Sequence, residues 1–240
     1  MPLLQHIKER YNLTKRSALV VGISLSILLV FAYLSVVMSN IASYWSISNK
    51  TTDPLPDIFF EYFPAYNLHT YVDNFLTGYI TICILVVLRR KDALLIYFKT
   101  FTCTFISYGI RLTLLAATNL PDPNMNCFKV ATNILTESRF GRCGDLLFSG
   151  HTISFTTVFL VWYDYPFFNS RALYKISVAT IFGLYVLGLA GILLSRYHYT
   201  VDILLSIYVT FFVWRLFDYY WAKDLQFDAH FADLNINEQI

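Results

Sequence analysis

The sequence has few charged residues and few cysteines. Only 14% of its 240 residues are Asp, Glu, Lys or Arg, whereas 56% are hydrophobic. So apolar a composition excludes an ordinary water-exposed domain and is typical of a polytopic membrane protein. The formal net charge of +2 comes without a long basic run, which excludes an electrostatic nucleic-acid interface. The four cysteines show no Cys-x-x-Cys pair and no His/Cys ligand spacing, so we expect no zinc site.

Six hydrophobic stretches are long enough to cross a membrane as helices. A helix of about 20 residues covers about 30 Å of hydrocarbon. We therefore predict an all-α membrane protein with six transmembrane helices in one domain, residues 18–221. A cytosolic segment, 1–17, precedes this domain, and a polar cytosolic tail, 222–240, follows it. The predicted spans are 18–38, 70–88, 93–117, 146–163, 174–195 and 199–221.

The positive charges predict the orientation of these spans. Twelve of the 18 Lys and Arg residues fall on one side of the membrane and five on the other. The positive-inside rule then places both termini in the cytosol. His151 opens the fourth span and His198 opens the sixth, and both spans run inward. The two histidines therefore share one membrane edge, lumenal or extracellular, and they share an edge in either orientation.

Ionisable residues at membrane depth are costly and usually functional. His198 and Asp202 lie four residues apart, so they share one face of a helix. A carboxylate on one imidazole nitrogen fixes the tautomer and stabilises the positive charge that develops when the other nitrogen attacks. His151 can then act as the general acid and base. The pattern fits phosphoryl-type transfer through a phosphohistidine.

Phosphate oxygens need positive charge and hydrogen-bond donors around them. Arg196 is adjacent to the second histidine motif, and Arg111 lies near the outer end of the third span. Backbone amides at Ser149 and Gly150 could add donors at a helix start. The glycine also lets the chain approach a phosphate closely.

Several polar residues have two interpretations. Arg111 is either a phosphate ligand or an ion-pair partner of Asp57 or Asp145, and Asp145 either binds a headgroup or caps a helix. His69 and Asp73 also have the i, i+4 spacing, at the outer start of the second span. No phosphate-binding residues accompany them, so we interpret them as a structural polar pair.

Cys127 and Cys143 share one predicted outer loop. A loop on that side faces an oxidising compartment, where disulfides persist. The sequence therefore leaves two alternatives, a disulfide between these cysteines or two free thiols.

Two motifs resemble the sphingomyelin synthase family, relatives of the type 2 phosphatidic acid phosphatases. Residues 143–152 match its pattern Cys-Gly-Asp-x-x-x-Ser-Gly-His-Thr, and residues 198–202 match His-Tyr-Thr-x-Asp. Residues 54–57, Pro-Leu-Pro-Asp, and the region 108–127 resemble two less specific motifs of the family. The resemblance covers roughly residues 50–221 and includes the order of six spans.

The resemblance implies a catalytic triad of His151, His198 and Asp202 and no metal or other cofactor. His198 would take the phospho-headgroup from a membrane phospholipid, and ceramide would accept it. Phosphocholine ranks first as the headgroup, before phosphoethanolamine and phosphoinositol. The order stays open because Arg196-Tyr197 stands where many members have His-Glu. The resemblance also implies a lumenal or exterior site in the Golgi, plasma membrane or ER, with a homo-oligomer as a further option.

Two other functions stay open at this point. A lipid phosphatase or a phospholipase-C-like hydrolase would use the same phosphohistidine, with water in place of ceramide. The separation of Arg196 from His198 by a single residue disfavours a simple phosphatase. A non-catalytic lipid-binding membrane protein is the third interpretation, and the intact triad argues against it.

Overall fold

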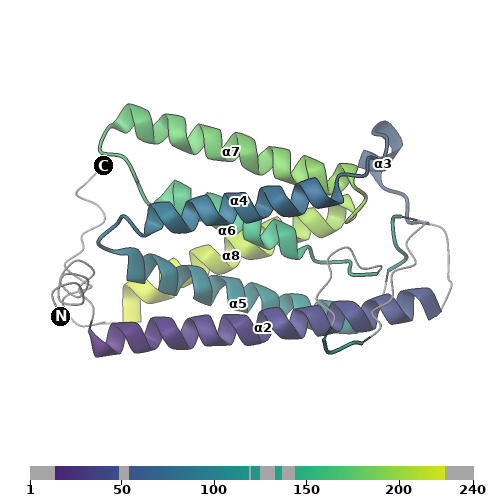
Figure 1. Ribbon diagram of the computed structural model, residues 1–240, viewed down its shortest axis with the longest axis horizontal. Helices are drawn as coiled ribbons and strands as arrows, with labels where there is room; N and C mark the ends of the chain where they lie inside the picture. The colour runs from purple at the N-terminus through teal and green to yellow at the C-terminus, as the bar shows by residue number, and fades with distance from the viewer. Residues whose placement is uncertain (1–13, 49–53, 119, 125–132, 137–143, 225–240) are drawn as a thin grey trace.

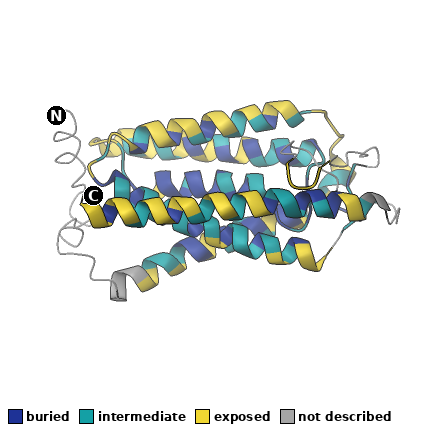
Figure 2. Ribbon diagram, turned by 60° about the horizontal axis from the view of Figure 1, so that its bottom comes forward, coloured by how far each residue is buried: buried dark blue, intermediate teal, exposed yellow. Residues whose placement is uncertain are grey.

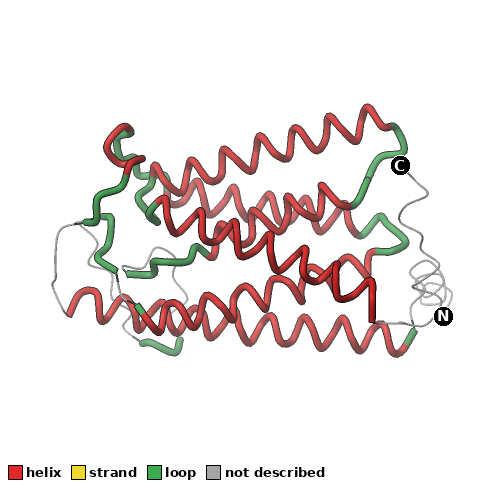
Figure 3. The backbone as a smooth tube through the Cα atoms, turned by 180° about the vertical axis from the view of Figure 1, so that it is seen from behind, coloured by secondary structure: helices red, strands yellow, loops and turns green. Residues whose placement is uncertain are grey.

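The computed structural model describes residues 14–48, 54–118, 120–124, 133–136 and 144–224. Across these residues the chain forms helices and loops and no strand, as Figure 3 shows. The all-α prediction is therefore confirmed for the described part of the chain. The helices are α2 (Lys15–Ser48), α3 (Ile58–Tyr62), α4 (His69–Val87), α5 (Ala93–Ala117), α6 (Gly150–Asp164), α7 (Arg171–Leu194) and α8 (Thr200–Asp224).

Five of these helices are long and apolar enough to span a membrane: α2, α4, α5, α7 and α8. The chain is therefore an integral membrane protein. The fourth predicted span, 146–163, differs from the prediction. Its first residues form an extended loop, and only the 15-residue helix α6 follows. At 1.5 Å per residue, α6 covers about 22 Å, less than the hydrocarbon core of a bilayer.

Helix α6 lies at the centre of the bundle and contacts α4, α5, α7 and α8, whereas α2 packs along α5 (Figure 1). Nine of the α6 residues are buried, more than half of the helix. Close packing of α6 against α7 depends on Gly188, because a Cβ atom there would lie 2.6 Å from the ring of Phe155. Small residues of this kind are what allow membrane helices to approach closely.

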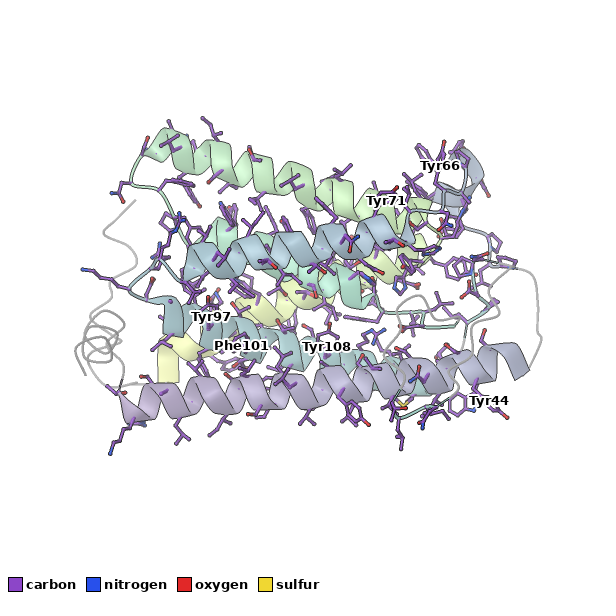
Figure 4. The ribbon with its side chains drawn as sticks, in the orientation of Figure 1. Tyr44, Tyr66, Tyr71, Tyr97, Phe101 and Tyr108 are labelled. Atoms are coloured by element: carbon purple, nitrogen blue, oxygen red, sulfur yellow. The ribbon has the colours of Figure 1, made fainter. Side chains whose placement is uncertain are left out.

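The outer surface of the bundle is apolar. Exposed residues line the outward faces of the helices and buried residues lie between them (Figure 2). Leu29 on α2, Leu187 on α7 and Phe212 on α8 are each more than 60% exposed. Lipid tails, not water, suit such a surface. Tyr44, Tyr66 and Tyr71, all exposed, lie at one end of the bundle (Figure 4), where an aromatic belt at the membrane interface would be expected.

The starts of α4, α6 and α8 lie at the same end of the bundle as α3 (Figure 1). The described chain begins and ends at the opposite end, which agrees with a shared side for the two termini. Their cytosolic location stays a prediction. Residues 1–13 and 225–240, in the predicted terminal segments, lie outside the described residues.

Candidate active site

His198 and Asp202 form the pair that their spacing predicts. The imidazole Nδ1 lies 3.3 Å from the carboxylate Oδ2, and both residues are buried, with exposed fractions of 4% and 0%. The same carboxylate oxygen accepts a hydrogen bond from the backbone N–H of Tyr199 at 3.0 Å. Because the carboxylate accepts, Nδ1 carries the proton, and the lone pair of the neutral imidazole is on Nε2.

A serine in the next turn of α8 ties this helix to the loop before α6. Ser206 Oγ donates to the backbone carbonyl of Asp202 at 2.6 Å and accepts from the backbone N–H of Ser149 at 2.7 Å. The start of α6, which carries His151, is thereby held against the start of α8, which follows His198. Sequence spacing alone does not reveal this contact.

His151 has a carboxylate partner on another helix. Its Nε2 lies 2.8 Å from Oδ1 of Asp73 on α4. Tyr197 stacks on the imidazole, with ring centroids 5.4 Å apart, and its hydroxyl donates to Asp73 Oδ2 at 3.4 Å. The interpretation of Asp73 as half of a structural pair with His69 therefore needs correction. The ring of His69 instead lies edge-on to Tyr197, at 4.1 Å between centroids.

His151 and His198 line the same cavity of about 280 Å³. Arg111, Asp145 and Gly150 line it as well, so five of the eight predicted site residues meet there. Asp202 acts on this cavity through His198. The remaining lining residues are Ala32, Ser35, Val36, Ser39, Leu76, Tyr108, Ser154 and Tyr197.

Arg111 forms an ion pair with Asp145, one of the two partners that the sequence left open. Its Nε also donates to the backbone carbonyl of Phe148 at 2.9 Å, and its other nitrogens contact Ser35 and Ser39 of α2. Arg111 is buried, with an exposed fraction of 5%, and it still lines the cavity. A planar cation fixed in this way offers charge to a phosphate without having to reorganise.

The Asp145 carboxylate is held ionised. Burial alone would raise its pKa, but the charge of Arg111 and the hydrogen bonds from Arg111 and from Ser39 Oγ, the latter at 2.9 Å, keep the pKa below its usual value. The preceding Gly144 has a φ of +72°, and a Cβ atom there would lie 2.6 Å from Ser46 Cβ. A side chain at that position would therefore displace the loop that carries Asp145.

Ser149 and Gly150 have different roles from each other. Ser149 is fully buried and caps α6, since its Oγ accepts from the backbone N–H of Thr152 at 3.2 Å. Its own N–H already binds Ser206, so the residue positions the helix and does not face the cavity. Gly150 does line the cavity, and a Cβ atom there would lie 3.6 Å from Arg111 Nε.

Arg196 lies outside the cavity, unlike the prediction from its place in the sequence. Its φ of +56° is in the left-handed region, and its guanidinium lies 3.7 Å from the centroid of the Phe60 ring. It also donates to the backbone carbonyl of Phe63 at 2.9 Å. The Arg196 guanidinium therefore contacts α3 and the residue after it, and Arg111 is the arginine that lines the cavity.

Asp57 caps two helices at once. Its Oδ1 accepts from the backbone N–H of Phe59 at 2.9 Å, and its Oδ2 accepts from the N–H of Thr200 at 2.7 Å. The acidic turn at residues 54–57 thus fixes the start of α8 beside the pair of His198 and Asp202. Cys127 and Cys143, the candidate disulfide, lie outside the described residues.

Asp122, in the turn after α5, holds the loop of Asp145 from the other side. Its carboxylate accepts from the backbone N–H of Asn124 at 2.7 Å and of Gly144 at 3.0 Å. Burial raises the pKa of Asp122 to about 6, although these hydrogen bonds oppose the rise. A carboxyl whose pKa is raised by folding contributes most to the stability of the folded protein at low pH, where it is protonated. This stability is lost as the pH rises through the raised pKa.

We therefore expect the folded protein to lose about 1–2 kcal/mol of stability through Asp122, a half-buried group, as the pH rises from about 4 to about 6. Thermal melting of the purified protein across this range measures the effect. The difference in melting temperature between Asp122→Asn and the parent should grow in favour of the variant as the pH rises. A difference that is constant with pH would contradict the assignment.

The segment that carries the paired histidines of this helical bundle also matches known proteins. A family model described as the PAP2 superfamily C-terminal domain matches residues 142–220. This segment contains both histidine motifs and the whole of α6 and α7.

Three relatives illustrate the similarity. The phosphatidylinositol:ceramide inositolphosphotransferase of Trypanosoma cruzi is 34% identical over 51% of this chain and 39% of its own length. Two proteins of Caenorhabditis elegans are each 28% identical: sphingomyelin synthase-related 2, over 64% of this chain and 52% of its own, and phosphatidylcholine:ceramide cholinephosphotransferase 2, over 65% and 53%. The chain spans about half the length of these relatives or less.

Residues 142–220 thus match the PAP2 superfamily, and the relatives of the chain include sphingomyelin synthase-related proteins and ceramide cholinephosphotransferases. The resemblance drawn from the two histidine motifs is thereby confirmed. The names of the relatives differ in the headgroup, so the headgroup has to be argued from the site itself.

Proposed function

We propose that the protein transfers a phospho-headgroup from a glycerophospholipid to ceramide, with phosphocholine as the preferred headgroup. One observation carries the proposal: two histidines, each with its own carboxylate, line one cavity with a buried arginine between membrane helices. The relatives named above support ceramide as the acceptor. The positive-charge bias supports a site at the lumenal or exterior face.

The proposed reaction has two steps at one phosphorus. His198 Nε2 attacks the phosphorus, and the bond from phosphorus to the diacylglycerol oxygen breaks. The departing alkoxide takes a proton from His151, and diacylglycerol leaves. The primary hydroxyl of ceramide then gives its proton to His151 and attacks the phosphohistidine. The phosphorus–nitrogen bond breaks, which restores His198 and yields the phosphosphingolipid.

An apolar chamber supports lipids as both substrates. A second cavity, of about 300 Å³, adjoins the first and shares Ala32, Tyr108 and Ser154 with it. Aliphatic and aromatic side chains of α2, α4, α5 and α6 line it, among them Tyr97 and Phe101 (Figure 4). An acyl chain fits such a space, with the phosphate at the polar end.

Two tyrosines support choline as the headgroup. Tyr108 and Tyr197 line the polar cavity from α5 and from the turn before α8 (Figure 4 labels Tyr108). Aromatic faces attract quaternary ammonium groups, which cannot donate hydrogen bonds. Inositol would need a set of hydrogen-bonding partners for its ring hydroxyls. The polar side chains that face the cavity are largely engaged with one another.

The test is an assay of donor and acceptor together. Membranes that contain the protein are incubated with fluorescent ceramide and with phosphatidylcholine, phosphatidylethanolamine or phosphatidylinositol in turn. We expect fluorescent sphingomyelin with phosphatidylcholine as the best donor. A better product yield from another donor would overturn the headgroup assignment alone. Diacylglycerol release without any sphingolipid product would overturn the transferase and leave a hydrolase.

Asp73→Asn is expected to lower turnover about tenfold to hundredfold. This loss is smaller than the full contribution of a general acid, because His151 itself remains. The asparagine keeps the size of the side chain but removes the charge that orients the imidazole of His151. Transfer rates over a range of pH measure the loss. Asp218→Asn is the matched control, because it removes a carboxylate from an ion pair with Lys99, which keeps a second partner in Asp164. Equal rates for Asp73→Asn and the parent would contradict this role.

A further inference from the structure

A second groove lies at the end of the bundle opposite α3, between α6 and α7. Its volume is about 780 Å³. Phe159 of α6 and Val178, Ala179 and Phe182 of α7 form its apolar wall. Nothing in the proposed reaction uses this groove, since the two histidines lie at the other end of these helices (Figure 1).

Two cations stand at the mouth of the groove. Arg171 begins α7 and Lys175 follows one turn later on the same face, and both are exposed. Neither forms an ion pair or a side-chain hydrogen bond with any residue that the structure describes. Ser170 provides no side-chain cap, so the first N–H groups of α7 add positive potential at the same place.

Three other cations near this end of the bundle are neutralised. Lys99 pairs with Asp218, Arg215 pairs with Asp164 at 3.0 Å, and Arg90 pairs with its neighbour Asp92. Asp164 also lines the groove, but its two oxygens already accept from Arg215, and one of them accepts from Trp214 at 2.6 Å. The mouth of the groove therefore carries uncompensated positive charge.

We propose that this groove binds one anionic phospholipid from the leaflet at that end of the bundle. The lipid phosphate lies between Arg171 and Lys175 at the start of α7, and one acyl chain runs along Phe159, Val178 and Phe182. A lipid is the occupant that fits an apolar wall within the membrane span and two cations at its end. The site is separate from the substrate cavity and does not depend on the proposed reaction.

The experiment uses the purified full-length protein in detergent, titrated with phosphatidylserine or with phosphatidylcholine, and follows the melting temperature. We expect a saturable rise with phosphatidylserine. Arg171→Gln/Lys175→Gln should weaken the apparent affinity about thirtyfold, since each cation near an anionic lipid contributes about fivefold. Ala179→Trp should weaken it as well, because the indole fills the groove without a change of charge. Lys91→Gln, an exposed cation at the same end but outside the groove, is the matched control and should behave as the parent.

Four outcomes would overturn the proposal. An equal rise with phosphatidylcholine would remove the role of headgroup charge. An equal loss in Lys91→Gln would indicate diffuse attraction to the surface. An unchanged response in Ala179→Trp, or an equal rise with inorganic phosphate alone, would remove the role of the apolar wall. Native mass spectrometry of co-purified lipid gives a second readout that does not depend on melting.

Discussion

Replacing His198 by alanine is expected to abolish headgroup transfer, with a loss of about 10⁴-fold or more. The imidazole is the only group that can form the phosphorus–nitrogen bond in the proposed reaction, and Asp202 has no use without it. The small buried volume that the change leaves should cost little stability beside the loss of chemistry. The measurement is the rate of fluorescent sphingolipid formation, together with the melting temperature of the variant.

Asp202→Asn provides the graded comparison. It keeps the volume of the side chain but leaves Nδ1 of His198 without a carboxylate, so the wrong tautomer becomes available, and we expect a loss of about 10²–10⁴-fold. A phosphoenzyme label from a radioactive donor should be absent in His198→Ala and reduced in Asp202→Asn. Transfer by His198→Ala at the parent's rate would refute the phosphohistidine.

Arg111→Met is expected to lower both stability and activity. The change leaves the Asp145 carboxylate without its cation, which costs on the order of 3 kcal/mol for a largely buried pair. It also removes the positive charge nearest the start of α6, where the phosphate would lie. A missing donor of this kind costs about 10²–10³-fold in rate.

The double variant Arg111→Met/Asp145→Asn separates these two effects. With both charges gone, no unpaired ion remains, so the melting temperature should recover most of its loss. Activity should stay low, because the phosphate still lacks its cation. Recovery of activity along with stability would mean that Arg111 has a purely structural role. Thermal melting and transfer rates on the same preparations decide between the two.

The part of the site that spacing alone predicted is the local part. His198 and Asp202 are only four residues apart, although His198 lies in the turn before α8 and not on the helix itself. The Asp202 carboxylate in the first turn of α8 reaches back to this turn and also accepts from the N–H of Tyr199, so the pair is local to one short segment. The partner of His151 was not predictable in this way, since Asp73 comes from another helix, 78 residues away in the chain. The nearer His69 has the right spacing but turns its ring to Tyr197.

Two differences between the prediction and the structure have definite physical causes. Arg196 is close to His198 in sequence, but its left-handed backbone turns the guanidinium toward α3. The fourth span looked complete because Leu146 and Phe148 are apolar, yet they lie in a loop that is itself buried, with exposed fractions of 2% and 0%. Hydropathy measures burial and does not separate a buried loop from a helix.

The depth of the cavity has a consequence for the proposed phosphohistidine. Arg111, which contacts the residues just before α6, lies six residues before α5 ends at Ala117, a rise of about 9 Å along the helix, so a phosphate bound by Arg111 would lie below that helix end. At such a depth the activity of water is low, whereas a lipid alcohol is held at high local concentration. The partition of the phosphoenzyme between hydrolysis and transfer would then be set by depth. A loop that raised the site toward the surface would change the product without changing a catalytic residue.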